Sequence, residues 1–217
     1  MWPMQDQPAY RATALGAAYE RIDRLPVTVL LDNIRSLYNV GAFFRTADAV
    51  KAERICLAGI CPTPDDTRIA KTALGAERLQ PWTRYADPLE AIIELQARGY
   101  EVAAVETTLD ALDLFDWPSR FPVCIVFGHE VDGISPALLD RCDTHVRIPT
   151  LGTKQSINVA TAGGVVLYEL LRKYRRRLEG TQTADGRQYG GCLCRRRGPR
   201  GPRPVTAEML PAVSSPA

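Results

Sequence analysis

Residues 122–135, PVCIVFGHEVDGIS, give the clearest indication of how this chain folds. The first six residues are almost wholly apolar, and Gly128 ends the run. A continuous apolar strand is typical of a parallel sheet, because helices cover both of its faces. The loop that follows carries Glu130 and Gly133, at the carboxyl end of the strand, where open parallel sheets bind ligands. The stretch therefore predicts an α/β fold together with a binding loop.

Strands and helices are expected to alternate along most of the chain. Asn39 is the expected N-cap residue of a helix over 41–50, and Ser135 with Pro136 begins a later helix. The alternation predicts a parallel sheet flanked by helices. The expected strands are 28–32, 54–60, 79–85, 101–106, 122–127 and 144–149, and the expected helices are 8–24, 41–50, 69–74, 88–99, 137–142 and 157–171.

The length of 217 residues suits one domain with extensions. We expect a helical N-terminal extension at 1–26, a folded domain at 27–177 and a disordered basic tail, rich in Gly, Pro and Arg, at 178–217. No apolar run approaches the roughly 20 residues that span a membrane, and no secretory signal is visible. The six cysteines form no CxxC pair, which argues against a zinc site or a disulfide framework. A cytoplasmic protein without bound metal is expected.

The formal net charge of +2 is unevenly distributed along the chain. Residues 1–171 contain 16 basic and 22 acidic residues, whereas the short segment 172–177, RKYRRR, contains five basic residues. A basic cluster of this kind fits a polyanionic partner such as RNA. On charge alone, a solvated helix end followed by a basic tail explains the segment equally well.

Three segments place polar residues in loops after predicted strands: 33–49, 126–135 and 148–164. Taken singly, each has a structural explanation, because Asn and Ser cap helices and Gly forms turns. In this order and spacing they closely resemble the SpoU/TrmH family of RNA ribose 2′-O-methyltransferases, in the SPOUT (α/β-knot) superfamily. The resemblance extends from about residue 27 to residue 174.

Each segment resembles one motif of that family. The first matches N-x-G-x-x-x-R-T-A, with Asn39 and Arg45, and the second matches Gly-x-Glu-x-x-Gly. The third matches Ile-Pro followed by Ser-Leu-Asn-Val, with Ile157 as a conservative departure from Leu. The residues matched in the second and third motifs are Gly128, Glu130, Gly133, Ile148, Pro149, Ser156, Ile157, Asn158 and Val159.

The resemblance implies a C-terminal trefoil knot, which general topology rules would not predict. It also implies that S-adenosylmethionine binds at the knot, largely through backbone groups near Gly128, Ile148 and Ile157. Glu106, at the end of its strand, is expected to touch the cofactor as well. Glycine-rich loops with few bulky side chains suit such a ligand.

The implied reaction is transfer of the cofactor's methyl group to a ribose 2′-hydroxyl of structured RNA. Transfer RNA is slightly favoured over ribosomal RNA because the extensions are short. The resemblance places the hydroxyl near Arg45, which we expect to hold a phosphate and stabilise the developing alkoxide, since a guanidinium barely deprotonates. The residues expected to orient the reacting groups are Asn39, Glu130, Ser156 and Asn158. The residues expected to contact RNA phosphates are Arg172, Lys173, Arg175, Arg176 and Arg177.

The resemblance further implies a homodimer that pairs through the knot region. The last predicted helix contains small residues that permit close approach of a partner: Ala160, Ala162, Gly163 and Gly164. The alternative is that the same helix is simply buried within its own subunit.

Two other functions are alternatives to RNA methylation. A nicotinamide-dependent oxidoreductase needs G-x-G-x-x-G directly after the first strand, and residues 28–41 contain no such cluster. A catalytically silent RNA-binding or assembly protein on the same fold is the second alternative. The complete set of motif residues argues against it.

Overall fold

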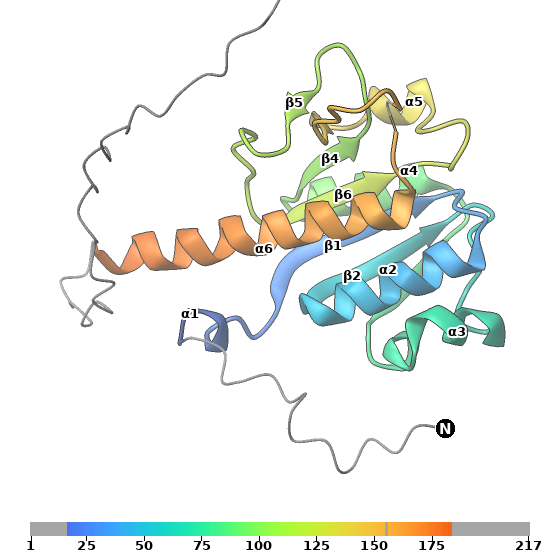
Figure 1. Cartoon of the computed structure of the whole chain (residues 1–217), viewed down its shortest axis with the longest axis horizontal. Helices are drawn as coiled ribbons and strands as arrows, with labels where there is room; N and C mark the ends of the chain where they lie inside the picture. Colours follow the sequence, from blue (N-terminus) through green and yellow to red (C-terminus); the bar gives the residue numbers. More distant parts are fainter. Residues whose placement is uncertain (1–16, 155, 184–217) are drawn as a thin grey trace, which may run out of the picture.

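A computed structural model of the chain describes residues 17–154 and 156–183 and shows a parallel sheet between two layers of helices (Figure 1). In this part of the chain the sheet has seven strands in the order β3-β2-β1-β6-β4-β7-β5, and every neighbouring pair is parallel. The predicted fold class is thereby confirmed. The strands are β1 (Leu25–Asp32), β2 (Ala52–Ala58), β3 (Trp82–Tyr85), β4 (Glu101–Val105), β5 (Leu112–Asp113), β6 (Val123–Phe127) and β7 (Thr144–Arg147).

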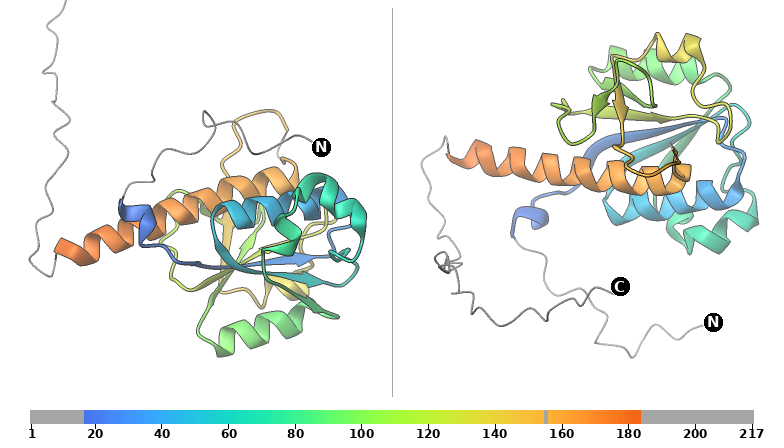
Figure 2. Two further views of the ribbon diagram at one scale, coloured as in Figure 1. Left: turned by 90° about the horizontal axis from the view of Figure 1, so that it is seen from below. Right: turned by 45° about the horizontal axis from the view of Figure 1, so that its top comes forward.

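The helices form one layer on each face of the sheet, as the left view of Figure 2 shows. Helices α2 (Leu37–Ala49) and α6 (Val159–Thr183) lie side by side on one face, and α4 (Pro88–Ala97) and α5 (Pro136–Leu139) cover the other. The short elements are α1 (Ala17–Glu20), α3 (Ala70–Ala73) and the 3-10 helices η2 (Thr67–Ile69) and η3 (Ala76–Arg78).

The alternation of side chains along β1 and β6 explains the two layers. Val29 in β1 and Ile125 in β6 face the core formed with α2 and α6, whereas Leu30 and Val126 face the core formed with α4 and α5. All four side chains are fully buried. Strand β6, the apolar run that indicated the fold, pairs with β1 on one side and β4 on the other. It is therefore the central strand expected from its composition.

Three local details differ from the sequence-based expectation. Helix α2 begins at Leu37 with Ser36 as its N-cap, so Asn39 lies within the first turn and is not the cap. Helix α6 continues to Thr183, beyond the expected domain boundary at 177, because Leu178 still packs against the core and Glu179 pairs with Arg175. Strand β5, which has only two residues, was not predicted. Residues 8–16 of the expected first helix and 184–217 of the expected tail lie outside the described residues, and the knot stays a prediction.

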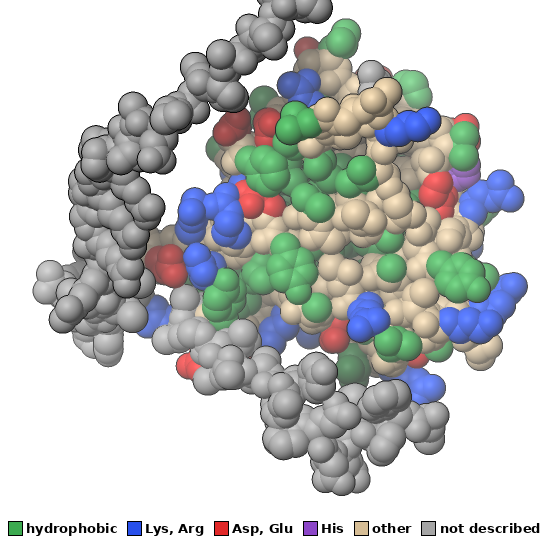
Figure 3. Space-filling view, viewed as in Figure 1, with side chains coloured by type: hydrophobic (Ala, Val, Ile, Leu, Met, Phe, Trp, Pro, Cys, Tyr) green, Lys and Arg blue, Asp and Glu red, His purple; other side chains and the backbone are tan. Residues whose placement is uncertain are grey.

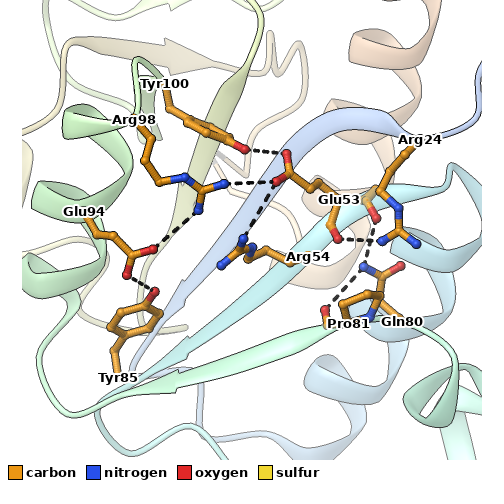
Figure 4. A network of polar contacts seen from close by, with 10 residues as sticks. Arg24, Glu53, Arg54, Gln80, Pro81, Tyr85, Glu94, Arg98 and Tyr100 are labelled. Carbon is orange, nitrogen blue, oxygen red and sulfur yellow. Dashed lines mark hydrogen bonds and ion pairs between the residues drawn. The ribbon is translucent and has the colours of Figure 1, made fainter.

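A cluster of polar and charged side chains lies near the amino-terminal ends of β2 and β4 (Figure 4). The carboxylate of Glu53 pairs with Arg54 and Arg98 and accepts a 2.5 Å hydrogen bond from Tyr100. Burial and this hydrogen bond raise the pKa of Tyr100 to about 12. The cluster joins β2 to α4 and therefore stabilises the scaffold.

The helices in the described ranges are all too short or too polar to span a lipid bilayer.

Candidate functional site

A pocket of about 510 Å³ opens at the carboxyl-terminal ends of β4, β6 and β7 and is closed on one side by the start of α6. Its size lies within the range typical of small-molecule sites. The wall combines apolar side chains with hydroxyl, amide and charged groups. Such a lining suits a ligand that has a flat, weakly polar ring and polar or charged groups at its ends. The apolar residues include Val105, Phe127, Ile148, Ile157 and Ala162, and the polar ones include Glu106, Thr107, Glu130, Arg147, Thr150, Ser156 and Asn158.

The loop between β6 and α5 is closed on itself by backbone hydrogen bonds. The N–H of His129 donates to the carbonyl of Gly133 at 3.1 Å, and the N–H of Gly133 donates back at 2.9 Å. Gly133 has φ +70°, and a Cβ on Gly128 would lie 2.4 Å from the Gly133 backbone. Both positions therefore require glycine. The Glu106 carboxylate accepts from the N–H of Ile134 at 3.2 Å, so this pocket residue also fixes the loop.

Glu130 connects this loop to the start of α2. Its carboxylate accepts hydrogen bonds from the backbone N–H groups of Arg35 and Ser36, at 3.3 and 3.2 Å, and from the Asn39 amide at 3.0 Å. Partial burial acts to raise the pKa of Glu130, but these hydrogen bonds outweigh it and leave the pKa below its ordinary value. The carboxylate is therefore held ionised at the positive end of the helix dipole.

Asn158 extends the same network to α6. Its amide donates to the Asn39 side-chain oxygen at 3.1 Å, and its own oxygen accepts from the N–H groups of Ala160 and Thr161. Asn158 thus caps α6 while holding α2. The chain Glu130–Asn39–Asn158 brings together one residue from each of the three motif segments. The predicted residues Ser156 and Ile157 line the pocket beside it.

Arg45 is exposed on α2 and is not among the residues that line the pocket. It follows Asn39 by six residues, which places it about 9 Å farther along the helix and about 120° around it. The structure therefore brings Asn39, Glu130, Ser156 and Asn158 to one site and leaves Arg45 outside the pocket lining.

The basic segment 172–177 is less available than its composition suggests. Arg172 forms a bidentate ion pair with Glu169, and Arg175 donates to the Tyr19 hydroxyl at 2.9 Å. Lys173 is less accessible than an RNA contact requires, because its ammonium group is mostly buried and donates to the carbonyls of Leu114 and Trp117. Burial lowers the pKa of Lys173. Two arginines of the segment, Arg176 and Arg177, are exposed.

Both described histidines have structural partners. His129 Nδ1 accepts from the N–H groups of Val131 and Asp132 and steadies the loop, while His145 lies between the Thr108 hydroxyl and the Leu139 carbonyl. Sequence reasoning missed Arg147 as a pocket residue, although its position directly before Ile148 was a signal for it. Within the described ranges, no three His, Cys, Asp or Glu side chains are grouped as metal ligands.

Comparison with known proteins agrees with this geometry. The chain is 32% identical over 149 residues to a Staphylococcus haemolyticus protein assigned to the TrmH family of tRNA/rRNA methyltransferases, a match that covers 69% of this chain and 59% of that protein. It is 31% identical to the 23S rRNA (guanosine-2′-O-)-methyltransferase RlmB of Ralstonia nicotianae, over 75% of this chain and 65% of the relative. The chain thus spans about 60% of the length of these curated relatives.

Solved structures show the same fold. The SpoU methyltransferase AviRb from Streptomyces viridochromogenes, in complex with AdoMet, superimposes with a TM-score of 0.63 at 30% identity, over 70% of this chain and 61% of AviRb. An AdoMet-bound rRNA methyltransferase from Sinorhizobium meliloti gives 0.63 at 30% identity, over 68% of this chain and 56% of that chain. Residues 26–168, which include the pocket and its network, match the SpoU rRNA Methylase family, and this chain belongs to that family.

Proposed function

We propose that the protein transfers a methyl group from S-adenosylmethionine to a ribose 2′-hydroxyl of a structured RNA, in the cytoplasm. The observation that carries the proposal is the pocket at the carboxyl edge of the sheet, joined by Glu130, Asn39 and Asn158 to helix α2, whose outer face is exposed. A pocket for a small ligand and a surface for a large one are thereby held in fixed relation. Membership of the family and the similarity to RlmB, a 23S rRNA (guanosine-2′-O-)-methyltransferase, support the ribose as the acceptor.

The residues present fit S-adenosylmethionine. Apolar groups such as Ile148 and Val159 suit an adenine ring, Glu106 offers a carboxylate to hydroxyl or ammonium groups, and Arg147 offers the opposite charge to a carboxylate. When bound, the cofactor supplies an electrophilic methyl group, so the protein needs to align the acceptor and help its proton leave.

The side chains around the pocket divide that work. Glu130, whose pKa is lowered by its hydrogen bonds, stays ionised and holds the start of α2 against the pocket. Asn39 and Asn158 fix the relative position of α2 and α6. Arg45, exposed on α2, is proposed to bind the phosphate next to the acceptor ribose and stabilise the oxygen as it loses its proton. Ser156 lines the pocket and is proposed to orient the ribose.

The test uses tritiated S-adenosylmethionine with unmodified transcripts of transfer RNA and of 23S rRNA, followed by nuclease digestion and mass spectrometry. The expected product is a 2′-O-methylated nucleoside from one RNA class. Methylation of a base would contradict the ribose assignment. Cofactor and RNA binding without any transfer would instead favour a silent RNA-binding protein.

A further inference from the structure

Tyr38 presents an exposed aromatic ring at the start of α2. Its side chain is 60% exposed, although large aromatic groups usually lie in a core or an interface. The backbone beneath it is fixed, because the Tyr38 carbonyl accepts a hydrogen bond from the Thr72 hydroxyl at 3.2 Å. One turn later, a Cβ on Gly41 would lie 2.6 Å from the Ile69 carbonyl, so α2 packs directly on the η2–α3 segment. The ring therefore projects from a rigid base.

This ring lies next to the pocket network. Asn39, the following residue, is hydrogen-bonded to two pocket residues, Glu130 and Asn158. Tyr38 and Arg45 are seven residues apart, nearly two full helical turns, so they share one face of α2 about 10 Å apart. Tyr38 is thus next in sequence to a residue of the pocket network and lies on the face of α2 that carries the arginine proposed to contact RNA.

The surroundings of Tyr38 favour a negatively charged partner. Arg35, Arg45 and Lys71 are exposed and form no ion pair with any residue in the described part of the chain, whereas Arg68 is neutralised by Asp66 at 2.6 Å. Figure 3 shows Lys and Arg side chains above and below an apolar group over the N-terminal end of α2 and over α3, at the right edge of the view. Free cations around an exposed ring are the combination that binds single-stranded nucleic acid.

We propose that Tyr38 is a stacking platform for an unpaired nucleobase beside the methylated nucleotide. Sequence-tolerant RNA recognition splays bases out of their stack and places them on aromatic rings, while cations hold the phosphates. This inference rests on the proposed function, because it takes RNA to be the substrate. It adds that the target lies in a loop or bulge, since a base within a duplex cannot reach the ring.

Photocrosslinking locates the contact without depending on turnover. Stem–loop RNAs transcribed with 4-thiouridine are irradiated with the full chain and digested with trypsin. Cleavage after Arg35 and Arg45 releases SLYNVGAFFR, in which Tyr38 is exposed while Phe43 and Phe44 are buried. A crosslink on this peptide that is absent from Tyr38→Ala is expected. Crosslinks confined to other peptides, or no RNA binding at all, would overturn the proposal.

Steady-state kinetics separate stacking from other roles. Tyr38→Ala should raise the KM for RNA about 5- to 100-fold and leave S-adenosylmethionine affinity unchanged, whereas Tyr38→Phe should behave like the native protein. Ile93→Ala, at an exposed position on the opposite face of the sheet, is the control. A Phe variant with as high a KM for RNA as the Ala variant would assign the effect to the hydroxyl and refute stacking.

Light scattering tests a different role for the ring. Conversion of a dimer to a monomer by Tyr38→Ala would place the ring in a subunit interface and overturn the proposal. A native chain that crosslinks at Tyr38 yet methylates no RNA would refute the proposed function alone.

Discussion

Arg45 carries the most direct test of the reaction at the level of single residues. Replacement by Ala removes a group that we propose to act at the reacting oxygen, so kcat should fall by orders of magnitude while cofactor affinity changes little. Single-turnover transfer with saturating RNA, together with calorimetric titration of S-adenosylmethionine, measures both quantities. Arg45→Lys keeps the charge and loses the planar fork, so near-native turnover in that variant would show that a point charge suffices. An Ala variant with the native rate would make Arg45 a solvated surface residue.

Glu130 gives the site a pH dependence whose direction follows from its lowered pKa. A carboxylate with a lower pKa in the folded state stabilises the protein above its unfolded pKa, and this stabilisation is lost as the pH falls through the folded value. Glu130 is exposed, so solvent screens its charge, and Glu130→Gln should lower the Tm at pH 7 by only about 1–4 °C. The difference from the native protein should shrink as the pH falls below about 4, where the carboxylate of the native protein becomes protonated. Glu90→Gln, at an exposed position in the first turn of α4, is the control. A constant difference from pH 3 to pH 8 would show that the charge of Glu130 is not involved.

The sequence predicted the polar residues of the site better than their partners. Asn39, Glu130 and Asn158 each belonged to a motif, but nothing local showed that their side chains form one chain of hydrogen bonds. The residue type of Asn39 predicts a helix cap, because Asn commonly caps helices. In the structure its amide instead donates to a carboxylate 91 positions later, and Ser36 is the cap. A hydrogen bond between residues so far apart in the sequence cannot be predicted from the sequence around Asn39.

Two adjacent glycines in α6 provide a matched pair for the packing of elements. A Cβ on Gly163 would lie 2.2 Å from the ring of Phe43, at the contact between α6 and α2, whereas a Cβ on Gly164 meets nothing within 4 Å. Gly163→Ala should cost about 1–3 kcal/mol of unfolding free energy because the core is overpacked. Gly164→Ala should stabilise the chain by about 0.5–1 kcal/mol, since alanine favours the helix.

Urea denaturation followed by circular dichroism measures both glycine variants at one temperature. Equal effects at the two positions would contradict the close approach of α6 and α2. The same geometry favours burial within the subunit for two of the small residues of α6, because Gly163 and the buried Ala162 contact their own subunit, and the homodimer stays a prediction.

At the basic end of α6, some residues are expected to stabilise the fold and others to bind RNA. Lys173→Gln removes the ammonium that holds the carbonyls of Leu114 and Trp117, so unfolding free energy should fall while RNA affinity at fixed temperature stays near native. The double variant Arg176→Gln/Arg177→Gln should instead weaken RNA binding and flatten its salt dependence. Filter binding across a salt series, with denaturation curves for each variant, separates the two. A loss of RNA affinity in folded Lys173→Gln would restore that lysine as a phosphate contact.

Element boundaries were predictable where periodicity was strong and failed where a tertiary contact decided them. The apolar strands β1, β4 and β6 were placed to within three residues. Strand β5 is not predictable from the sequence, because two residues are too few to show a periodic pattern and the strand is defined by its pairing with β7. Helix α6 extends past the apolar repeat since charged residues at its end, including Arg172 and Arg175, find partners along the helix and on α1.

At the level of the whole molecule, an exposed apolar surface marks the place where we expect two copies to associate. Leu112, Phe115 and Tyr168 are 45%, 53% and 55% exposed, and hydrophobic side chains gather over the β5 region and α6 in Figure 3. Apolar surface of this kind marks interaction sites. We expect a homodimer by multi-angle light scattering, and a Phe115→Asp/Tyr168→Asp variant should shift toward the monomer mass of about 24.0 kDa. A native chain that is monomeric at 50 µM would contradict the expectation.

The position of β6 in the sheet also governs the order in which the chain can assemble during synthesis. Strands β1 and β4 leave the ribosome before β6, which then has to lie between them. Until that moment the nascent chain exposes two strand edges that are free to pair wrongly. Direct pairing of β1 with β4 would leave no place for the strand that carries the loop 128–134. A chain trapped in this way would contain a sheet and lack the ligand pocket, so a chaperone that delays early pairing would protect activity more than it protects secondary structure.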